Sequence, residues 1–218
     1  MSKNLTKAQI KRQKLREETE ILNGKRKKLN DCEDVDDHLS ILPMFKKFTK
    51  GGLELTIKSL KHAPSELESW IFESVKENMQ SFYENGNGWS DEIKSDELFE
   101  DRSRYIIAFD GEKPVGFVHF RFELDTPDFL VYIYEIHINK EYRLKGIGKF
   151  MMQAIEFVGL KRGAEYVMVT LFKENLNGVG FFSSLHYVPH PSSPEMIDPE
   201  EAINSFYQIF YKSLVKKN

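Results

Sequence analysis

The chain has 218 residues, of which 40% are hydrophobic, and its formal net charge is −3 at pH 7. This length suits one well-buried domain with an appendage better than two full domains. A single cysteine, Cys32, excludes an internal disulfide and a cysteine-built zinc site. Because the sequence shows neither a secretory hydrophobic region nor an apolar run long enough to span a bilayer, we expect a soluble intracellular protein without membrane contact.

The positive charge gathers near the start of the chain. Residues 1–28 hold ten Lys or Arg and three Glu, a net charge of +7, so the remaining 190 residues carry −10. We therefore expect a basic, partly helical extension over residues 1–49 and one domain over residues 50–218. The basic run 25–28 could act as a nuclear localisation patch or contact nucleic acid or the ribosome, although such runs are also common on solvated surfaces.

Hydrophobic periodicity in the domain predicts a mixed α/β order of elements. The predicted strands cover residues 53–58, 105–109, 115–122, 130–138 and 166–172, with a last strand within 203–214. Asp110-Gly111 predicts a hairpin turn between the second and third of these strands. The predicted helices are one after Pro64 with apolar residues at helical spacing over 67–82, one that runs through Leu160 and ends at Gly163, and a short one within 175–185.

The pattern Arg143-x-x-Gly146-x-Gly148 lies between a predicted strand and a predicted helix. Positions without a side chain let backbone N–H groups approach a phosphate, and the helix that follows offers its positive end. A dinucleotide-binding fold is not indicated, because no G-x-G-x-x-G follows a strand and no P-loop lysine motif occurs. The placement favours a pyrophosphate cradle over an ordinary glycine-containing turn before a core helix.

This order of elements resembles the GNAT acetyltransferase superfamily over roughly residues 50–214. A second segment, Lys173-Glu-Asn175-x-x-Gly178-x-x-Phe181-Phe182 followed by His186-Tyr187, resembles the second cofactor motif of that superfamily. The resemblance implies an α/β (α+β) GNAT acyltransferase fold with a central mixed, mostly antiparallel sheet flanked by helices, acetyl-CoA as cosubstrate and no metal. The positions that it implies for acetyl-CoA are Ile136, His137, Ile138, Arg143, Leu144, Lys145, Gly146, Ile147, Gly148, Lys149, Asn175 and Ser192.

Further segments are similar to the NatD family of N-terminal acetyltransferases. They are Leu42-Pro-Met-Phe-Lys-Lys-Phe48, Asn78-Met79 with Tyr83-Glu84, Gly88-Trp89, Val118-His-Phe-Arg-Phe122, Tyr132-x-Tyr134-Glu135, Thr170-Leu-Phe-Lys173 and Ser192-Ser-Pro194. This resemblance implies acetylation of the N-terminal serine of histone four and histone two-A, whose tails begin Ser-Gly-Arg-Gly. It also implies a monomer without an obligate auxiliary subunit, located in the nucleus and the cytoplasm.

Transfer of an acetyl group to an α-amine requires removal of a proton, since the amine has a pKa of roughly 8. Glu135, inside an apolar strand, is the candidate base through a water molecule; otherwise its charge is satisfied by a basic neighbour. A bulge or splay in this strand could bring Tyr134 and Glu135 to one site, and a backbone N–H within 134–138 could bind the acyl oxygen. Many GNAT enzymes have a tyrosine where Phe182 stands here, so Tyr134 is the candidate proton donor, although such a phenol also commonly packs.

Glu123 and Asp125 are the candidates for recognising a substrate arginine, because carboxylates pair with guanidinium in a bidentate way. Without the resemblance they would be interpreted as a solvated acidic turn. The other predicted substrate contacts are Tyr83, Trp89, Tyr132, Tyr134, Thr170 and Tyr207. Two alternatives remain open, namely a GNAT enzyme acting on a lysine or small amine, and a non-catalytic histone or nucleic-acid binding module. The complete glycine pattern argues against the non-catalytic module.

Overall fold

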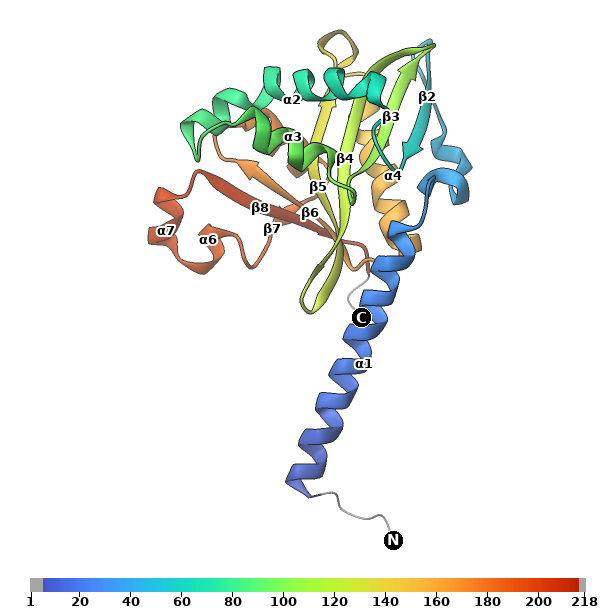
Figure 1. Cartoon of the computed structure of the whole chain (residues 1–218). Coiled ribbons are helices and arrows are strands. Elements are labelled where there is room, and N and C mark those ends of the chain that lie inside the picture. Colours follow the sequence, from blue (N-terminus) through green and yellow to red (C-terminus); the bar gives the residue numbers. More distant parts are fainter. Residues whose placement is uncertain (1–5, 216–218) are drawn as a thin grey trace.

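The computed structural model describes residues 6–215, which build one sheet with helices on both faces (Figure 1). In this part of the chain the sheet has eight strands, in the spatial order β1-β2-β3-β4-β5-β6-β8-β7. All neighbouring pairs are antiparallel except β5 and β6, which run parallel. The strands are β1 (Lys47–Lys50), β2 (Leu53–Leu60), β3 (Arg104–Asp110), β4 (Lys113–Asp125), β5 (Asp128–Ile138), β6 (Tyr166–Phe172), β7 (Val188–Pro189) and β8 (Tyr207–Ser213). The predicted mixed, mostly antiparallel sheet is confirmed.

Helices lie on both faces of this sheet. They are α1 (Lys7–Glu33), α2 (Ser65–Asn85), α3 (Asp91–Phe99), α4 (Ile147–Arg162), α5 (Leu176–Ser184), α6 (Pro194–Ile197) and α7 (Pro199–Asn204), with short 3-10 turns η1 (His38–Ile41), η2 (Pro43–Phe45) and η3 (Lys140–Tyr142). On one face, Ile71 and Val75 of α2 and Leu98 of α3 pack against β3 and β4. On the other face, α4 packs its buried side against β3, β4, β5 and β6.

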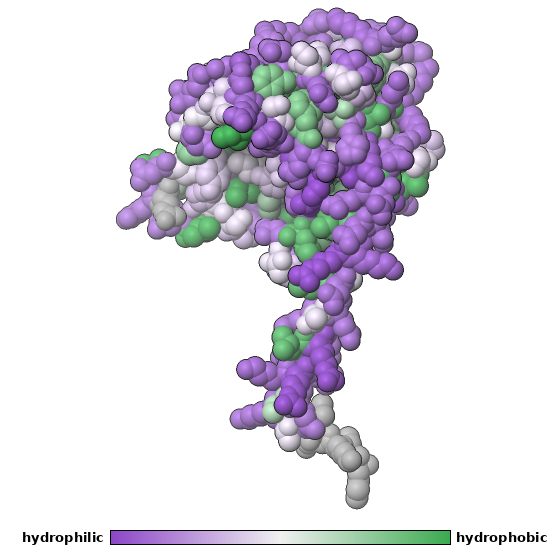
Figure 2. Space-filling model, viewed as in Figure 1, coloured by the Kyte–Doolittle hydropathy of each residue, from purple (hydrophilic) through white to green (hydrophobic). Residues whose placement is uncertain are grey.

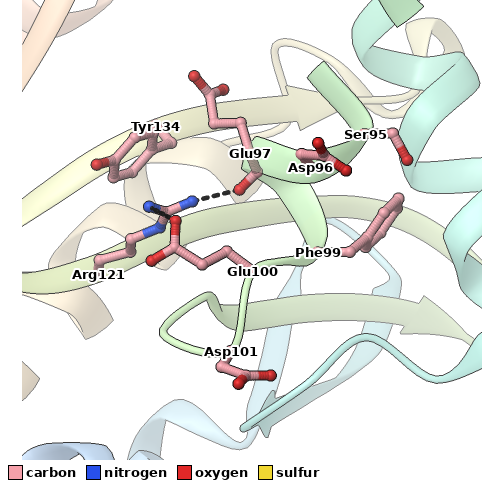
Figure 3. A pocket seen from close by; sticks show the side chains of 8 residues that line it. All are labelled: Ser95, Asp96, Glu97, Phe99, Glu100, Asp101, Arg121 and Tyr134. Carbon is pink, nitrogen blue, oxygen red and sulfur yellow. Dashed lines mark hydrogen bonds and ion pairs between the residues drawn. The ribbon is translucent and has the colours of Figure 1, made fainter. Parts of the chain in front are cut away.

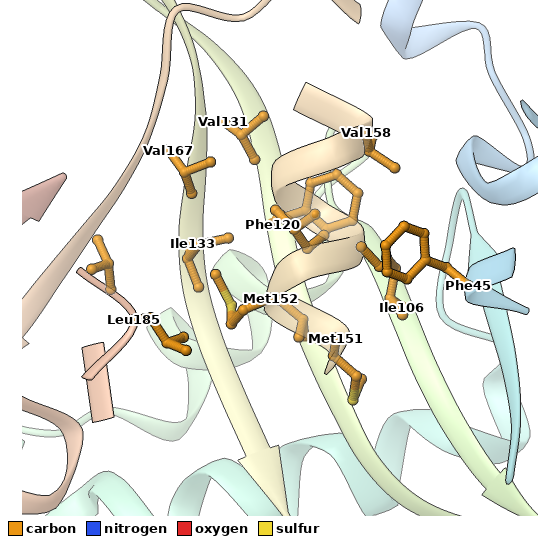
Figure 4. Packing of buried hydrophobic residues seen from close by; sticks show 14 of the residues in the cluster. Phe45, Ile106, Phe120, Val131, Ile133, Met151, Met152, Val158, Val167 and Leu185 are labelled. Carbon is orange, nitrogen blue, oxygen red and sulfur yellow. The ribbon is translucent and has the colours of Figure 1, made fainter. Parts of the chain in front are cut away.

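Successive side chains of β3 point to opposite faces of the sheet and belong to two separate cores. In β3, Ile106 and Ala108 face α4, while Tyr105 and Ile107 face α2. All four are fully buried, which explains why this strand reads as a continuous apolar run instead of an amphipathic one. The larger core continues through Met151 and its neighbours, shown in Figure 4. The sheet is therefore a rigid support on which the loops at its edges are positioned.

Helix α1 projects away from the body, and its outer part has a mainly hydrophilic surface (Figures 1 and 2). It begins at a capping box formed by Thr6 and Gln9. Its C-terminal end is anchored, since Cys32 is buried in the larger core and Glu33 binds Arg102 at 2.7 Å. Lys25 of the predicted localisation patch is also engaged, with its Nζ 2.6 Å from Glu165 Oε1.

The boundary expected between residues 49 and 50 falls inside the hairpin of β1 and β2. From Cys32 onward the chain belongs to the core, because Leu39, Leu42, Phe45 and Phe48 are buried with α4. Five further helices or strands were not foreseen, namely β1, α3, α6, α7 and β7, and the last strand begins at Tyr207. None of the helices described is long and apolar enough to cross a membrane.

Stability should fall in acid because of His38. This side chain is fully buried against Phe120 and Phe122, and neither ring nitrogen has a hydrogen-bond partner in the described residues. Burial, followed by the charges of Arg162 and Arg104, lowers the pKa of His38 from 6.5 to about 3. The unfolded chain therefore binds more protons between these values, so the free energy of unfolding decreases as the pH falls below 6.5.

We predict that His38→Leu removes this acid sensitivity. Between pH 7 and pH 5 the wild-type protein should lose about 2 kcal/mol more unfolding free energy than the variant, from this group alone. Urea denaturation at the two pH values measures the difference. His62→Leu, at an exposed histidine, is the matched control and should behave as wild type. An equal loss in wild type and His38→Leu would contradict the prediction.

Candidate active site

The turn before α4 is shaped for close approach by a ligand. Gly146, the N-cap of α4, has φ +92°, and no side chain from this position caps the first N–H groups of the helix. A Cβ at Gly148 would lie 3.3 Å from the ring of Phe181 on α5. Ile147 between them is buried in the core, whereas Leu144, Lys145 and Lys149 are exposed. The predicted cradle thus offers free backbone N–H groups at a helix N-terminus, an arrangement that fits a pyrophosphate.

Two residues of the cofactor motifs have protein partners. Arg143 donates from Nε to the carbonyl oxygen of Ile138 at 2.8 Å and from Nη2 to Asn78 Oδ1 at 2.8 Å, so it ties the cradle to β5 and α2. Asn175 caps α5, since its Oδ1 accepts from the N–H of Gly178 at 2.9 Å. A Cβ at Gly178 would lie 2.8 Å from Asn175 Nδ2. The Asn-x-x-Gly spacing is therefore explained by local structure. Asn175 and Gly178 form the cap of α5, the helix that packs on Gly148.

Strands β5 and β6 separate beside the cradle. Their parallel pairing ends at Ile133 and Val169, whereas β5 continues to Ile138 with β4 as its partner. Within the described chain, residues 134–138 thus have no strand on their β6 side, and Ile136, His137 and Ile138 lie in this segment. The register with β4 also shifts here, because His119 pairs with Glu135 and Phe120 with Ile133, which leaves Tyr134 as a bulge. The predicted bulge and splay are both present.

A cavity of about 320 Å³ opens at this separation. Of the residues predicted from the sequence, it is lined by Tyr83, Tyr132, Tyr134, Glu135, Thr170 and Tyr207. Trp89 packs its ring against that of Tyr83, with the centroids 5.5 Å apart. The hydroxyls of Tyr132 and Thr170 lie 2.5 Å apart and join the two separating strands. The cavity walls that the sequence did not predict are Met79, Asn87, Glu97, Ile133, Phe172 and Phe206.

A second, acid-rich hollow of about 720 Å³ adjoins the cavity and shares Glu97 and Tyr134 with it (Figure 3). Its other acidic residues are Asp96, Glu100 and Asp101. The guanidinium of Arg121 lies 4.3 Å from the centroid of the Tyr134 ring. It also bonds to the Glu100 carboxylate and to the carbonyl oxygen of Glu97. Arg121 therefore fixes the tyrosine that separates the two spaces.

The predicted arginine-binding pair is only partly assembled. Glu123 Oε1 accepts from the Tyr134 hydroxyl at 3.4 Å, so this carboxylate lies at the edge of the cavity. Its Oε2 is 3.0 Å from Arg102 Nη2, and that ion pair already offsets part of its charge. Asp125 lies two residues further along β4, on the same face of the strand, and is exposed beside the turn into β5. Asp125 has no ion-pair partner among the described residues, whereas the negative charge of Glu123 is shared with Arg102.

Glu135 is 4% exposed, and its carboxylate lies between two basic groups. Oε2 is 2.8 Å from His137 Nε2 and Oε1 is 3.4 Å from Lys94 Nζ. Burial would raise the pKa of Glu135, but the hydrogen bond with His137 and the charges of His137 and Lys94 outweigh it and lower the pKa. Since an ordinary carboxyl group already titrates roughly 4 pH units below an α-amine, this carboxylate is a good acceptor of hydrogen bonds and a weak proton acceptor.

The two cavity tyrosines keep their protons at neutral pH. Burial raises the pKa of Tyr83 and of Tyr134 to about 12 in each case. Each phenol can therefore donate a hydrogen bond or a proton but cannot serve as a base. Phe182, at the position where many superfamily members have tyrosine, is buried against Phe181 and Tyr187. A proton donor in this site must come from elsewhere than Phe182.

The predicted contact of Ser192 with the cofactor stays a prediction. The Ser192 hydroxyl lies 2.6 Å from His190 Nδ1, and the His190 ring packs against Tyr166 at 5.6 Å. The residues on either side of Ser192 contact β8, because the N–H of His190 donates to the carbonyl oxygen of Ile209 and the N–H of Ile209 donates to Ser193 Oγ. Ser192 therefore lies beside β8.

The comparisons agree with this geometry. The family model described as acetyltransferase (GNAT) family matches residues 66–187. The protein therefore belongs to the GNAT family and is an acetyl-CoA-dependent acetyltransferase.

Solved structures with the same fold include two enzymes of bacterial or archaeal origin. The ribosomal-protein-S18-alanine N-acetyltransferase of Escherichia coli shares 14% identity over 75% of this chain and 96% of that one, with a TM-score of 0.52. The PaiA N-acetyltransferase of Thermoplasma acidophilum, in complex with coenzyme A, shares 15% identity over 72% and 99%, with a TM-score of 0.53.

A plant structure with the same fold is Naa50 of Arabidopsis thaliana, in complex with the bisubstrate analogue CoA-Ac-MVNAL. It shares 14% identity over 73% of this chain and 98% of that one, with a TM-score of 0.51. At these identities the three likenesses show the fold alone.

Substitution of Gly148 should weaken acetyl-CoA binding. In Gly148→Val the new Cβ would start 3.3 Å from the Phe181 ring and 3.9 Å from Ile136, so its methyl groups would extend into the space beside the cradle. We expect a loss of affinity of at least about tenfold, roughly 1.4 kcal/mol, in isothermal titration calorimetry. Gly24→Ala in α1, where a Cβ meets nothing within 4 Å, is the control. Unchanged affinity in a folded Gly148→Val protein would refute the cradle assignment.

Proposed function

We propose that this protein is an N-terminal acetyltransferase of the NatD type, which acetylates the free serine amine of tails beginning Ser-Gly-Arg-Gly, as in histone four and histone two-A. The observation that carries the proposal is the joining of two spaces at Tyr134 and Glu97. A cavity of about 320 Å³ lies at the end of β5, and an acid-rich hollow adjoins it. A basic chain end fits this combination, with its first residue in the cavity and its cationic side chains outside.

Charge supports the choice of a basic substrate. Residues 29–218 carry a net charge of −10, and four carboxylates border the hollow. Long-range attraction of this kind speeds the approach of a cationic tail and weakens with salt. Aromatic side chains, among them Tyr132 and Tyr207, line the cavity, and small first residues such as serine and glycine would fit between them. Such a substrate is met in the cytoplasm before histone deposition and in the nucleus after it, and we propose both locations.

The residues of the chain can be given roles in this reaction. When bound, acetyl-CoA supplies the acetyl thioester that is transferred. The cradle at Gly146 and Gly148 holds the phosphate-bearing end, and the free edge of 134–138 offers N–H groups to the acyl oxygen. Glu135 orients the entering amine as a hydrogen-bond acceptor, directly or through water. The hydroxyl of Tyr134 or Tyr83 gives a proton to the departing CoA thiolate and takes back the proton that the amine nitrogen releases as the amide forms. The amine must enter neutral or lose its proton to solvent, because no strong base lines the cavity among the described residues.

We predict that a Ser-Gly-Arg-Gly peptide with a free N-terminus is acetylated on its α-amine, whereas the same peptide with a blocked N-terminus and an added internal lysine is left almost unmodified. In this proposal the cavity receives the end of a chain, and the acid-rich hollow receives the basic residues that follow it. Mass spectrometry with fragmentation of the products locates the acetyl group. Comparable acetylation of the blocked peptide would favour a lysine-directed or small-amine enzyme instead.

The carboxylates at the rim give a second prediction. Replacing Glu123 by Gln and Asp125 by Asn together should raise the KM for Ser-Gly-Arg-Gly at least tenfold, because charge-assisted hydrogen bonds are worth roughly 1.5–3 kcal/mol each. A Ser-Gly-Ala-Gly peptide should be poor for the wild type and hardly affected by the double substitution. Steady-state kinetics with both peptides forms a cycle. Additive losses in this cycle would show that these carboxylates do not contact the arginine.

Arg102 supplies the matched control for this cycle. Its guanidinium binds Glu123 at 3.0 Å and Glu33 of α1 at 2.7 Å. Arg102→Met frees Glu123 from its partner and should lower the KM for the arginine peptide, while Glu123→Gln should raise it. Both variants lose the ion pair between Arg102 and Glu123, and Arg102→Met also loses the contact with Glu33 of α1. A loss of local structure at the rim would therefore raise both KM values. A shift in the same direction would therefore assign the effect to the fold and not to recognition.

A further inference from the structure

Lys94 of α3 is a buried ammonium beside the cavity. Its side chain is 5% exposed, and Nζ donates to Tyr83 Oη at 2.6 Å, to Glu97 Oε1 at 2.6 Å and to Glu135 Oε1 at 3.4 Å. These acceptors come from α2, α3 and β5, and all three line the cavity. The three N–H bonds of the ammonium are thus used inside the protein. Lys94 therefore contacts three groups of the cavity wall without lining the cavity itself.

A gain in stability does not by itself explain why the Lys94 ammonium is buried. Removing an ammonium from water costs several kcal/mol, and replacing buried ion pairs by apolar side chains of similar volume is often neutral or stabilising. An apolar replacement of the whole network would therefore serve the fold as well, whereas loss of Lys94 alone leaves Glu135 buried without this partner and is destabilising.

Tyr83 shows one consequence of the contact. Its oxygen accepts a hydrogen bond from Lys94, and the ammonium also lies 4.3 Å from the centroid of its ring. The phenol has one proton of its own, and that proton has no acceptor among residues 6–215. Because the acceptor side of the oxygen faces Lys94 and the residue lines the cavity, the O–H is free to donate to a bound ligand.

We propose that Lys94 is a positioning residue for acetyl transfer, whose ammonium holds Glu135 as a carboxylate and directs the hydroxyl of Tyr83 into the cavity. The inference rests on the proposed function in that the cavity receives an amine. With Glu97 and Glu135 already bound to Lys94, neither carboxylate is free to form a full ion pair with an entering ammonium. The site thereby avoids stabilising the protonated amine, which cannot attack the thioester.

Other titratable side chains lie near the Glu135 carboxylate and affect its protonation. His137 on β5 holds the second oxygen of Glu135 at 2.8 Å. His119 on β4 is fully buried, and its pKa is lowered by burial and then by the charges of Arg121 and Lys94, so it stays neutral. Removal of the Lys94 charge leaves the hydrogen bond with His137 as the only close contact of Glu135 to a basic side chain in the described structure. The carboxyl group should then become protonated at a higher pH than in the wild type.

The test compares kcat/KM for a free-amine peptide between pH 6 and pH 9 in the wild type, Lys94→Met and Lys94→Arg, all in the full chain. In Lys94→Met we expect a loss that is at least about tenfold greater at pH 6 than at pH 9, since protonation removes the Glu135 acceptor in acid. Lys94→Arg keeps the charge, so its profile should follow the shape of the wild type. A loss by one constant factor at every pH, or no loss, would overturn the proposal.

A direct readout does not depend on the substrate or on the folding of Lys94→Met. Carbon-13 NMR of glutamate carboxyl groups, with the Glu135 signal assigned by its absence in Glu135→Gln, follows ionisation in the wild-type protein. We expect Glu135 to stay ionised down to pH 5, and titration near neutral pH would overturn the proposal. If the experiment with free and blocked peptides points to another kind of amine as the substrate, the proposed function fails. The Glu135 titration, and the pH comparison repeated with that amine, still test the role of Lys94.

Discussion

The separation of β5 from β6 is the constraint on which the rest of the site depends. Pairing stops at Ile133 and Val169, so the last residues of β5 keep one partner strand and present their other edge to a ligand. The same end of β5 leads into the turn at Gly146, which places free N–H groups of α4 beside that edge. The bulge at Tyr134 then brings a phenol and the adjacent carboxylate of Glu135 to one cavity, although simple alternation would put them on opposite faces. One interruption of the sheet therefore creates both the edge beside the cradle and the cavity between β5 and β6.

Electrostatics divides the surroundings of that cavity into two zones. Inside, the charges of Lys94 and Glu135 compensate each other in a buried network with His137, where a lone charge would be costly. Outside, past Tyr134, the acids of α3 are more exposed and leave the hollow with an excess of negative charge. Under the proposed function, a cationic tail would gain from the outer zone, whereas its terminal amine would enter a zone in which the carboxylates already have partners. Such a gradient would favour binding of a basic peptide without fixing its amine in the unreactive, protonated form.

The sequence predicted those parts of the molecule that local patterns determine. The apolar strands 166–172 and 130–138 were located to within about two residues, and the glycine pattern before α4 correctly marked a helix N-terminus. Helix α3 was missed because Lys94, one of its two buried residues, is charged, which hides the helical period. Without α3, neither Lys94 nor Glu97 could be recognised as part of the site. The packing of residues 32–48 into the core, which places the start of the body before residue 49, depends on long-range contacts that no local pattern encodes.

Arg102 connects the projecting helix with the rim of the site. It follows α3 directly, and its guanidinium contacts both Glu33 at the end of α1 and Glu123 at the cavity edge. Arg104, two residues later, donates to the carbonyl oxygen of Glu33 and satisfies the end of the same helix. Residues 102–104 thus contact both the end of α1 and the carboxylate of Glu123. Under the proposed function, a substrate cation at Glu123 would compete for that carboxylate with Arg102, whose guanidinium also holds Glu33 of α1.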